Sequence, residues 1–393
     1  EGRKVQVICP TPTRGVNPQV REEYKGRKSE KLHSGKVRVR RFWAPQEGRN
    51  PIIRAFRYFW CSFRSYQLAV RIKGVDLVFS NSTPPTQGML SALTAKRLSK
   101  KYKKKIPFVY NLQDIFPDSL VNAGMSSKGS FLWKIGRRIE NYTYENADKI
   151  IVISEGFKRN IMVKGAPEEK IKVISNWIDL DSVHPMSRED NKLINEFGID
   201  PYKFLIVYAG NFGAAQGADI VLKAAEKLKD ESNIQFVIFG GGLYFEEAKK
   251  TAEKLDNVFI HELMPADRIS EVYSLGDVAL ITCKPGTGNA GMPSKTWSIM
   301  ACNTPIIASF DTDSDLADVI RDSRAGVCID PGNVDALLGA IKVAYSEWGA
   351  GRQNSHSLRE YVRLNASKEI CVNRYIETIK SQCNRSVSYT HLR

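Results

Sequence analysis

Short apolar runs alternate with helical patterns through the second half of the chain. The apolar runs are rich in β-branched and aromatic residues and cover 204–209, 234–239, 258–260, 278–282, 305–308 and 326–329. Helical patterns separate or follow them at 218–229, 246–255, 268–275, 295–301, 316–322 and 334–348. Strands that are apolar on both faces and alternate with helices form parallel sheets covered on both sides. The pattern therefore predicts a doubly wound α/β domain.

The first half repeats this alternation less regularly. We expect strands at 5–9, 37–42, 75–80, 108–112, 150–153 and 171–174, and helices at 52–73, 86–100, 129–146 and 155–164. These elements predict a second sheet of similar type, so the fold class is α/β with two doubly wound, Rossmann-like domains. Because the chain opens directly on a strand, we expect that the first β-loop-α unit is missing.

The joint between the two domains is predicted at 178–200, where a polar stretch leads into a short helix. We assign residues 1–180 to an N-terminal domain and residues 181–357 to a C-terminal domain. A C-terminal helix at 358–382 is expected to pack back on the N-terminal domain, and 383–393 is expected to be an irregular tail.

The composition agrees with two ordinary domains. A chain of 393 residues with 42% hydrophobic content can bury two cores. It shows neither an apolar run long enough to span a membrane nor a signal-peptide pattern, so we expect a cytoplasmic protein. The seven cysteines are scattered, without the spacing of a zinc site, and we expect reduced, mostly buried thiols.

Positive charge is concentrated in one half of the chain. Residues 1–175 hold 35 lysines and arginines against 14 aspartates and glutamates, while the net charge of the whole chain is +15, so the remainder is acidic. No recognisable RNA- or DNA-reading motif accompanies this charge, which disfavours nucleic acid as a partner. A basic domain that faces an anionic membrane fits the asymmetry equally well.

Three glycine turns follow predicted strands of the C-terminal domain, where doubly wound sheets bind their ligands. One turn by itself is weak evidence, because tight connections use glycine for steric reasons alone. Three at strand ends of one sheet predict a phosphate site. Their candidate ligand-binding residues are Gly210, Asn211, Gly213 and Gln216 in the first turn, Gly240 and Gly241 in the second, and Lys284 and Gly291 in the third.

The third turn leads into a helix start that suits a diphosphate. Pro293 fits a first helical position, and Ser294 and Lys295 bring a hydroxyl group and a cation to the same place. The helix dipole disfavours a cation there, which favours an anion site over the alternative of a solvated lysine.

Four stretches of the C-terminal half resemble the donor domain of retaining glycosyltransferases of family 4, which have the GT-B fold. They read VYAGNFGAAQGADIVLKAAEKL at 207–228, FVIFGGG at 236–242, NVFIHELMPADRISEVYSLGDVALI at 257–281 and GMPSKTWSIMACNTPIIAS at 291–309. In the N-terminal half, NLQDIFPDS at 111–119, IIVISEGFKRNI at 150–161 and KIKVISNWID at 170–179 are similar to the subgroup that builds bacterial capsules and O-antigens.

The resemblance implies a nucleotide-sugar donor, UDP-linked above all, bound where two domains face each other across a cleft. It implies transfer of a hexosyl or N-acetylhexosaminyl group, and donor contacts from Met264, Met292 and Ser298 besides the turns. It implies neither a metal nor another cofactor, because the departing phosphate can itself take the acceptor proton. Catalysis then consists of positioning and of charge stabilisation by residues such as Lys295.

The sequence also departs from the family pattern. Two glutamates eight positions apart are replaced by Ala290 and Ser298, and an arginine and a lysine after the first strand are replaced by Asn211 and Gln216. Ser294 and Lys295 are candidates for the phosphate role of the missing cations, with Lys284 as a helper.

Gln113 and Asp114 follow a strand of the N-terminal domain, where the wider family often has histidine and an acid. Asp114 is a candidate catalytic residue that contacts the transferred sugar or the acceptor hydroxyl. Equally, it fits a strand-end aspartate that caps the next turn, with Pro117 enforcing that turn.

Two basic segments bear on the acceptor. In the helix expected at 55–71, Phe56, Phe59, Trp60 and Phe63 share one face and Arg57, Arg64 and Arg71 another, so the helix either faces the core or lies on lipid headgroups. Residues 96–105 hold seven basic residues and no acid, which fits a solvated helix end or a membrane contact. Together with the resemblance, they favour a lipid-linked glycan acceptor at the inner face of the plasma membrane.

Two other functions stay open. The missing cations and glutamates fit a non-catalytic partner subunit that binds a nucleotide sugar or a glycan. A nucleotide-sugar epimerase of similar architecture would need acid and base groups in the cleft, and none of the five histidines lies in a glycine turn.

Overall fold

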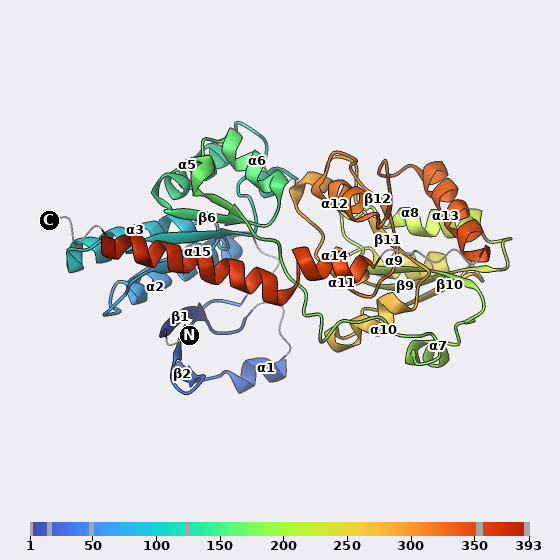
Figure 1. Ribbon diagram of the computed structural model, residues 1–393, viewed down its shortest axis with the longest axis horizontal. Helices are drawn as coiled ribbons and strands as arrows, with labels where there is room; N and C mark the ends of the chain where they lie inside the picture. Colours follow the sequence, from blue (N-terminus) through green and yellow to red (C-terminus); the bar gives the residue numbers. More distant parts are fainter. Residues whose placement is uncertain (1–2, 14–17, 47–50, 123–125, 351–356, 389–393) are drawn as a thin grey trace. The chain divides into compact units, whose positions relative to one another are not determined.

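The computed structural model describes residues 3–13, 18–46, 51–122, 126–350 and 357–388 (Figure 1). The chain divides into two compact units. The first consists of Glu1–Val152, Lys158–Lys172 and Ile376–Arg393, and the second of Ile153–Phe157 and Val173–Tyr375. Each unit contains parallel β-structure with helices between the strands, as the fold class predicts.

The second unit is built on one six-stranded parallel sheet. Its strands are β8 (Phe204–Asn211), β9 (Ile234–Gly241), β10 (Val258–Glu262), β11 (Val278–Thr282), β12 (Ile306–Ser309) and β13 (Gly326–Ile329). Their order across the sheet is β10-β9-β8-β11-β12-β13. This is the doubly wound order, in which the winding direction reverses between β8 and β11 and leaves a crevice beyond their carboxyl ends.

Helices cover both faces of this sheet because successive strand residues point to opposite sides. Val207 belongs to one buried cluster, together with residues of α10, α11, α12 and α14, whereas Tyr208 belongs to the other, together with residues of α8, α9 and α13. The helices of the unit are α7 (Lys192–Phe197), α8 (Asp219–Lys227), α9 (Phe245–Ala252), α10 (Ile269–Ser274), α11 (Lys295–Ala301), α12 (Asp315–Ser323), α13 (Val334–Gly349) and α14 (Leu358–Asn365).

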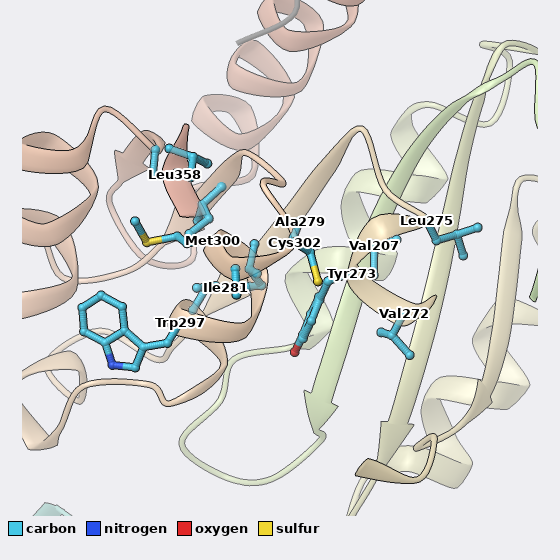
Figure 2. Packing of buried hydrophobic residues seen from close by; sticks show 14 of the residues in the cluster. Val207, Val272, Tyr273, Leu275, Ala279, Ile281, Trp297, Met300, Cys302 and Leu358 are labelled. Atoms are coloured by element: carbon cyan, nitrogen blue, oxygen red, sulfur yellow. The ribbon is translucent and has the colours of Figure 1, made fainter. Parts of the chain in front are cut away.

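Helix α11 is held almost entirely inside the first of these clusters. Every residue from 296 to 301 is buried, and Trp297 and Met300 lie in one cluster with Tyr273 and Leu358 (Figure 2). A helix buried in this way cannot shift without disturbing its neighbours. The position of its first residue is therefore fixed by the core.

The described residues of the first unit form two sheets, where sequence analysis predicted one. β4 (Val78–Asn81), β5 (Phe108–Leu112), β6 (Lys149–Val152) and β7 (Ile171–Val173) form a four-stranded sheet, and β1 (Val5–Pro10), β3 (Val37–Phe42) and β2 (Ser29–Leu32) form a separate one. β2 pairs with β3 in the antiparallel direction. Its sequence, SEKL, lacks an apolar run, which is why the pattern missed it.

The helices of the first unit surround these strands. They are α1 (Pro18–Glu23), α2 (Pro51–Ala69), α3 (Gln87–Tyr102), α4 (Asp118–Asn122) and α5 (Phe131–Asn146), while α6 (Glu155–Val163) begins in the residues assigned to the second unit.

The C-terminal end differs from the expectation of one helix and an irregular tail. Two helices are present, α14 and α15 (Lys368–Ser388), and α14 packs into the core of the second unit through Leu358 and Val362. α15 continues six residues into the expected tail, because the segment contains neither glycine nor proline to end it. The last five residues of the predicted tail, 389–393, lie outside the described residues.

Truncating the buried face of α11 should destabilise the second unit. We expect Met300→Ala to lower its free energy of unfolding by about 2–5 kcal/mol, the usual loss for a buried methionine. Val343→Ala is the control, because Val343 lies on α13 with 61% of its surface exposed and should change the value by less than about 0.5 kcal/mol. Urea unfolding measures both, and equal effects would contradict the role given to the α11 core.

Candidate functional site

The loops after β8, β9 and β11 meet at the point where the sheet order reverses. The Lys284 N–H donates to the Ala215 carbonyl at 2.9 Å, and the Thr282 hydroxyl donates to the Gln216 carbonyl at 2.7 Å. The Phe212 N–H donates to the Gly241 carbonyl at 2.7 Å. The three predicted glycine turns therefore form one continuous surface beyond the strand ends.

Glycine is required where these loops touch. Gly217 has a φ of +57°, and a Cβ atom there would lie 2.7 Å from the Cys283 carbonyl oxygen. Gly242 has a φ of +110°, and its Cβ would lie 1.8 Å from Asn211 Oδ1. Side chains at either position would force the turns apart.

Lys295 points from the start of α11 to the end of β8. Its Nζ donates to the Ala209 carbonyl at 3.0 Å and lies 4.7 Å from the centre of the Tyr208 ring. Gly210 leaves room for it, since a Cβ there would lie 2.6 Å from the amine. Burial lowers the pKa of Lys295 to about 8. These contacts do not fit the alternative of a solvated helix-start lysine.

Asn211 and Gln216, which stand where the related enzymes commonly have cations, converge on one glycine. A Cβ at Gly213 would lie 2.7 Å from Asn211 Nδ2 and 2.5 Å from Gln216 Oε1. The pair offers neutral amide donors and acceptors in place of positive charge. Within the described site, Lys295 is the cation at the end of β8.

The other predicted donor residues also lie in the second unit. Ser294 is exposed, Ser298 is buried on α11, and Met264 is half-buried, with its sulfur 3.8 Å from Arg268 Nη1. Gly240 is buried, while Gly241, Gly291, Met292 and Pro293 are half-buried. The side chain of Ala290 lies outside the described residues.

Lys284 lines a cavity of about 410 Å³ between α8 and α9. Gly213 and Gly217 form its border with the first glycine turn, and Lys223 and Tyr244 line it further out. Sequence analysis assigned Lys284 to the phosphate site as a helper. The structure places Lys284 at the wall of this cavity.

Asp311 is a site residue that sequence analysis missed. Its carboxylate follows β12 and accepts hydrogen bonds from the N–H groups of Gly286, at 2.9 Å, and Gly288, at 2.7 Å. Two charge-assisted bonds thus hold the glycine-rich loop that leads to α11. The sequence signal was a lone aspartate after a strand, which turns often contain for local reasons.

Gln113 and Asp114 lie at the carboxyl end of β5 in the first unit. Their N–H groups both donate to the Ser82 hydroxyl, at 3.0 and 3.1 Å, and the Gln113 side chain donates to Asn111 Oδ1 at 3.1 Å. Asp114 is exposed, yet the protein removes enough water from its carboxyl group to raise its pKa, against the opposing effect of a hydrogen bond with Ser119. The hydrogen bond with Ser119 fits the capping alternative, and the exposure of the residue as a whole fits the catalytic one.

Within the described parts of the chain, no three histidine, cysteine, aspartate or glutamate side chains gather in a way that could hold a metal ion. The described helices include none that is both long and apolar enough to cross a membrane.

Removing the Asp311 carboxylate should release the glycine-rich loop. In Asp311→Ala we expect the Gly286 and Gly288 amides to exchange their hydrogens about 10 to 100 times faster, since each loses a bond to a charged group. Asp313→Ala is the matched control, because the hydrogen bond that Asp313 accepts from this loop comes from the Asn289 side chain, at 3.1 Å, and not from a backbone N–H group. Hydrogen exchange that is unchanged in Asp311→Ala would contradict the anchoring role.

Comparisons with known proteins agree with this architecture. The model for glycosyl transferase 4-like domains matches residues 1–177, and the model for group 1 glycosyl transferases matches residues 189–365. The chain is 28% identical over 281 residues to "Probable glycosyltransferase WbjE" of Pseudomonas aeruginosa, covering 70% of this chain and 68% of that protein. It is 26% identical over 278 residues to "Putative colanic acid biosynthesis glycosyl transferase WcaI" of Escherichia coli K12, covering 69% and 67%.

A solved structure shares the fold at low sequence identity. The structure of Anabaena Alr3699/HepE in complex with UDP superposes with a TM-score of 0.70 at 15% identity, over 96% of this chain and all of that one. The two family models together cover both halves of the chain, in the order expected for a GT-B enzyme. The chain therefore combines a glycosyl transferase 4-like first half with a group 1 glycosyl transferase second half, and it has the GT-B fold.

Proposed function

We propose that this glycosyltransferase transfers a hexosyl or N-acetylhexosaminyl group from a UDP-sugar to a lipid-linked glycan, with retention of the anomeric configuration. The reaction would serve the synthesis of a surface polysaccharide such as a capsule or O-antigen, at the inner face of the plasma membrane. The names of WbjE and WcaI, and the UDP bound to HepE, support this direction.

One observation carries the proposal. The Lys295 amine lies half-buried at the end of β8, beside backbone turns that only glycine can form. A desolvated cation next to exposed N–H groups attracts an anion strongly, because neither has to be freed from water first. A nucleoside diphosphate is the anion that fits a doubly wound sheet at this point.

In the proposed reaction, the bond between the sugar C1 and the diphosphate oxygen breaks, and a bond from C1 to the acceptor oxygen forms on the same face. The acceptor proton passes to the departing phosphate oxygen. Lys295 and the Ser294 hydroxyl stabilise the charge that develops on the diphosphate. Asn211 and Gln216 orient it through neutral hydrogen bonds, and Asp114 contacts the sugar or the acceptor.

A panel of nucleotide sugars tests the proposal. The protein is incubated with each donor and a membrane lipid extract, and release of nucleoside diphosphate is measured. We expect one UDP-sugar to be consumed only when lipid acceptor is present, and proton NMR should show the product with the donor's anomeric configuration. Failure of every nucleotide sugar to bind would overturn the proposal.

The non-catalytic alternative is favoured by Asn211 and Gln216, which remove two charges from the diphosphate site. It predicts that a donor binds without turnover whichever acceptor is supplied. The same panel separates the two functions, since calorimetry reports binding and diphosphate release reports turnover.

Donor binding should weaken as pH rises, because the diphosphate prefers protonated Lys295. In the protein without donor, the pKa of the Lys295 amine is about 8. Raising the pH from 6.5 to 8.5 therefore removes the positive charge of Lys295 from most protein molecules that have no donor bound. We expect the Kd of the UDP-sugar to rise about fourfold over this range. In Lys295→Gln, binding should be about tenfold weaker at pH 6.5 and independent of pH. Calorimetry measures both proteins, and parallel pH profiles would contradict the role of Lys295.

Chelation should leave turnover unchanged, because the proposal assigns no step to a metal. We expect the initial rate in excess EDTA to stay within about 20% of the rate with added Mg²⁺, once a donor has been found. A loss of most activity that Mg²⁺ or Mn²⁺ restores would show that the metal-free mechanism is wrong.

A further inference from the structure

Helix α2 presents aromatic side chains to solvent along one face. Phe56, Phe59 and Phe63 follow one another at spacings of three and four residues and are 52%, 58% and 37% exposed. The rings of Phe59 and Phe63 stack with centroids 5.9 Å apart. We call these three residues the aromatic face. Such a stripe on a single helix is uncommon on a protein surface that stays in water.

The opposite face of α2 packs against the rest of the first unit. Arg57 is buried, with Nε donating to the Pro45 carbonyl at 3.0 Å and Nη2 donating to the Thr13 hydroxyl at 3.1 Å. Cys61 is buried in one cluster with Phe42. The sequence left open whether this helix faces the core or lipid, and the structure turns Phe56, Phe59 and Phe63 to solvent, while Trp60 packs partly against that cluster. Arg57 lies on the buried side because carbonyl and hydroxyl groups satisfy its guanidinium group.

Two tryptophans extend the aromatic face. Trp60 stacks on Phe56 with centroids 6.2 Å apart, and its Nε1 donates to the Trp43 carbonyl at 2.8 Å. Trp43 is itself 65% exposed. Tryptophan prefers the boundary between water and lipid, because its ring is apolar and its N–H is polar.

Positive charge lies beside this surface on α3. Lys96, Arg97, Lys100 and Lys101 are all exposed, and the run from 96 to 105 contains no acid. Arg97 Nη1 donates to the hydroxyl of Tyr66 on α2 at 3.4 Å, which places the basic side of α3 next to the aromatic helix. Aromatic residues flanked by cations match an anionic lipid surface in both polarity and charge.

We propose that the aromatic face of α2, with Trp43, inserts between the headgroups and acyl chains of an anionic bilayer while the basic residues of α3 bind the lipid phosphates. This deepens the proposed function, on which it rests for the lipid-linked acceptor. The helix lies in the plane of the membrane. The first unit then meets the membrane through α2, and the acceptor does not have to leave the bilayer.

Vesicle binding by the full chain tests the proposal. The wild type is mixed with vesicles of phosphatidylcholine alone, or with about one-third phosphatidylglycerol, and the bound fraction is measured by flotation. We expect binding to the anionic vesicles only. Brominated acyl chains should quench tryptophan fluorescence. This quenching requires that the tryptophan rings reach the acyl chains, which attraction to the headgroups alone does not achieve.

The test variant is Phe56→Ser/Phe59→Ser/Phe63→Ser, which changes only exposed side chains. We expect its affinity for anionic vesicles to fall by about tenfold or more, with the quenching lost. The matched control is Val163→Ser/Tyr202→Ser/Val343→Ser, which removes three other exposed apolar or aromatic side chains (90%, 87% and 61% exposed) and should bind as the wild type does.

Three results would overturn the proposal. In the first, the test variant binds vesicles as well as the wild type does, and in the second, the wild type does not bind them. In the third, sedimentation shows that the wild type is a dimer and the test variant a monomer, which means that a second copy covers the aromatic face. UDP binding is measured on the wild type, the test variant and the control variant, and its affinity should be equal in these three proteins. Loss of UDP binding by every protein, with vesicle binding intact, would reject the proposed function and leave the membrane contact standing.

Discussion

The desolvated amine of Lys295 is the constraint around which the second unit is built. Removing the Lys295 cation from water is unfavourable, and the lowered pKa of Lys295 expresses that cost, although the Ala209 carbonyl and the Tyr208 ring both attract the charged amine. The side chain stays in this place because α11 cannot move away from β8. The residues of α11 from 296 to 301 are buried in the core. A bound diphosphate would stabilise the protonated amine. The desolvated cation, which is unfavourable in the free protein, would then contribute to the affinity for the diphosphate.

The rest of the site serves this arrangement. Glycines at 217 and 242 let the three loops come within hydrogen-bonding distance of each other, and Asp311 fixes the loop before α11 by its two backbone contacts. None of these features needs a second cation. Under the proposed function, they explain how a chain with Asn211 and Gln216 in place of charged residues binds an anion at the switch point of its sheet.

Much of the second unit could be predicted because its four central strands are buried on both faces and its turns are marked by glycine. The bounds of β11, β13 and α11 follow directly from apolar runs and from the Pro293 helix start. Asp311 could not be predicted, since its partners lie more than twenty residues earlier and only the sheet order brings them together. The direction of Lys295 likewise depends on tertiary packing.

The first unit was less predictable for a related reason. β2 has no apolar run, and the amphipathic pattern of α2 does not tell which of its faces is buried. The sequence left both orientations of the helix open, and the hydrogen bonds of Arg57 place its side chain on the buried face. The periodicity of a helix shows that its two faces differ in polarity. Only the tertiary contacts show which face is exposed to water.

The most direct test of the account is an NMR titration of Lys295, with ¹³C-labelled lysine and Lys295→Gln for assignment. The account predicts a pKa of about 8 in the free protein and a rise of about one unit or more when UDP binds. A pKa in the ordinary range for lysine, or one that UDP leaves unchanged, would contradict the claim that this amine is held ready for a diphosphate.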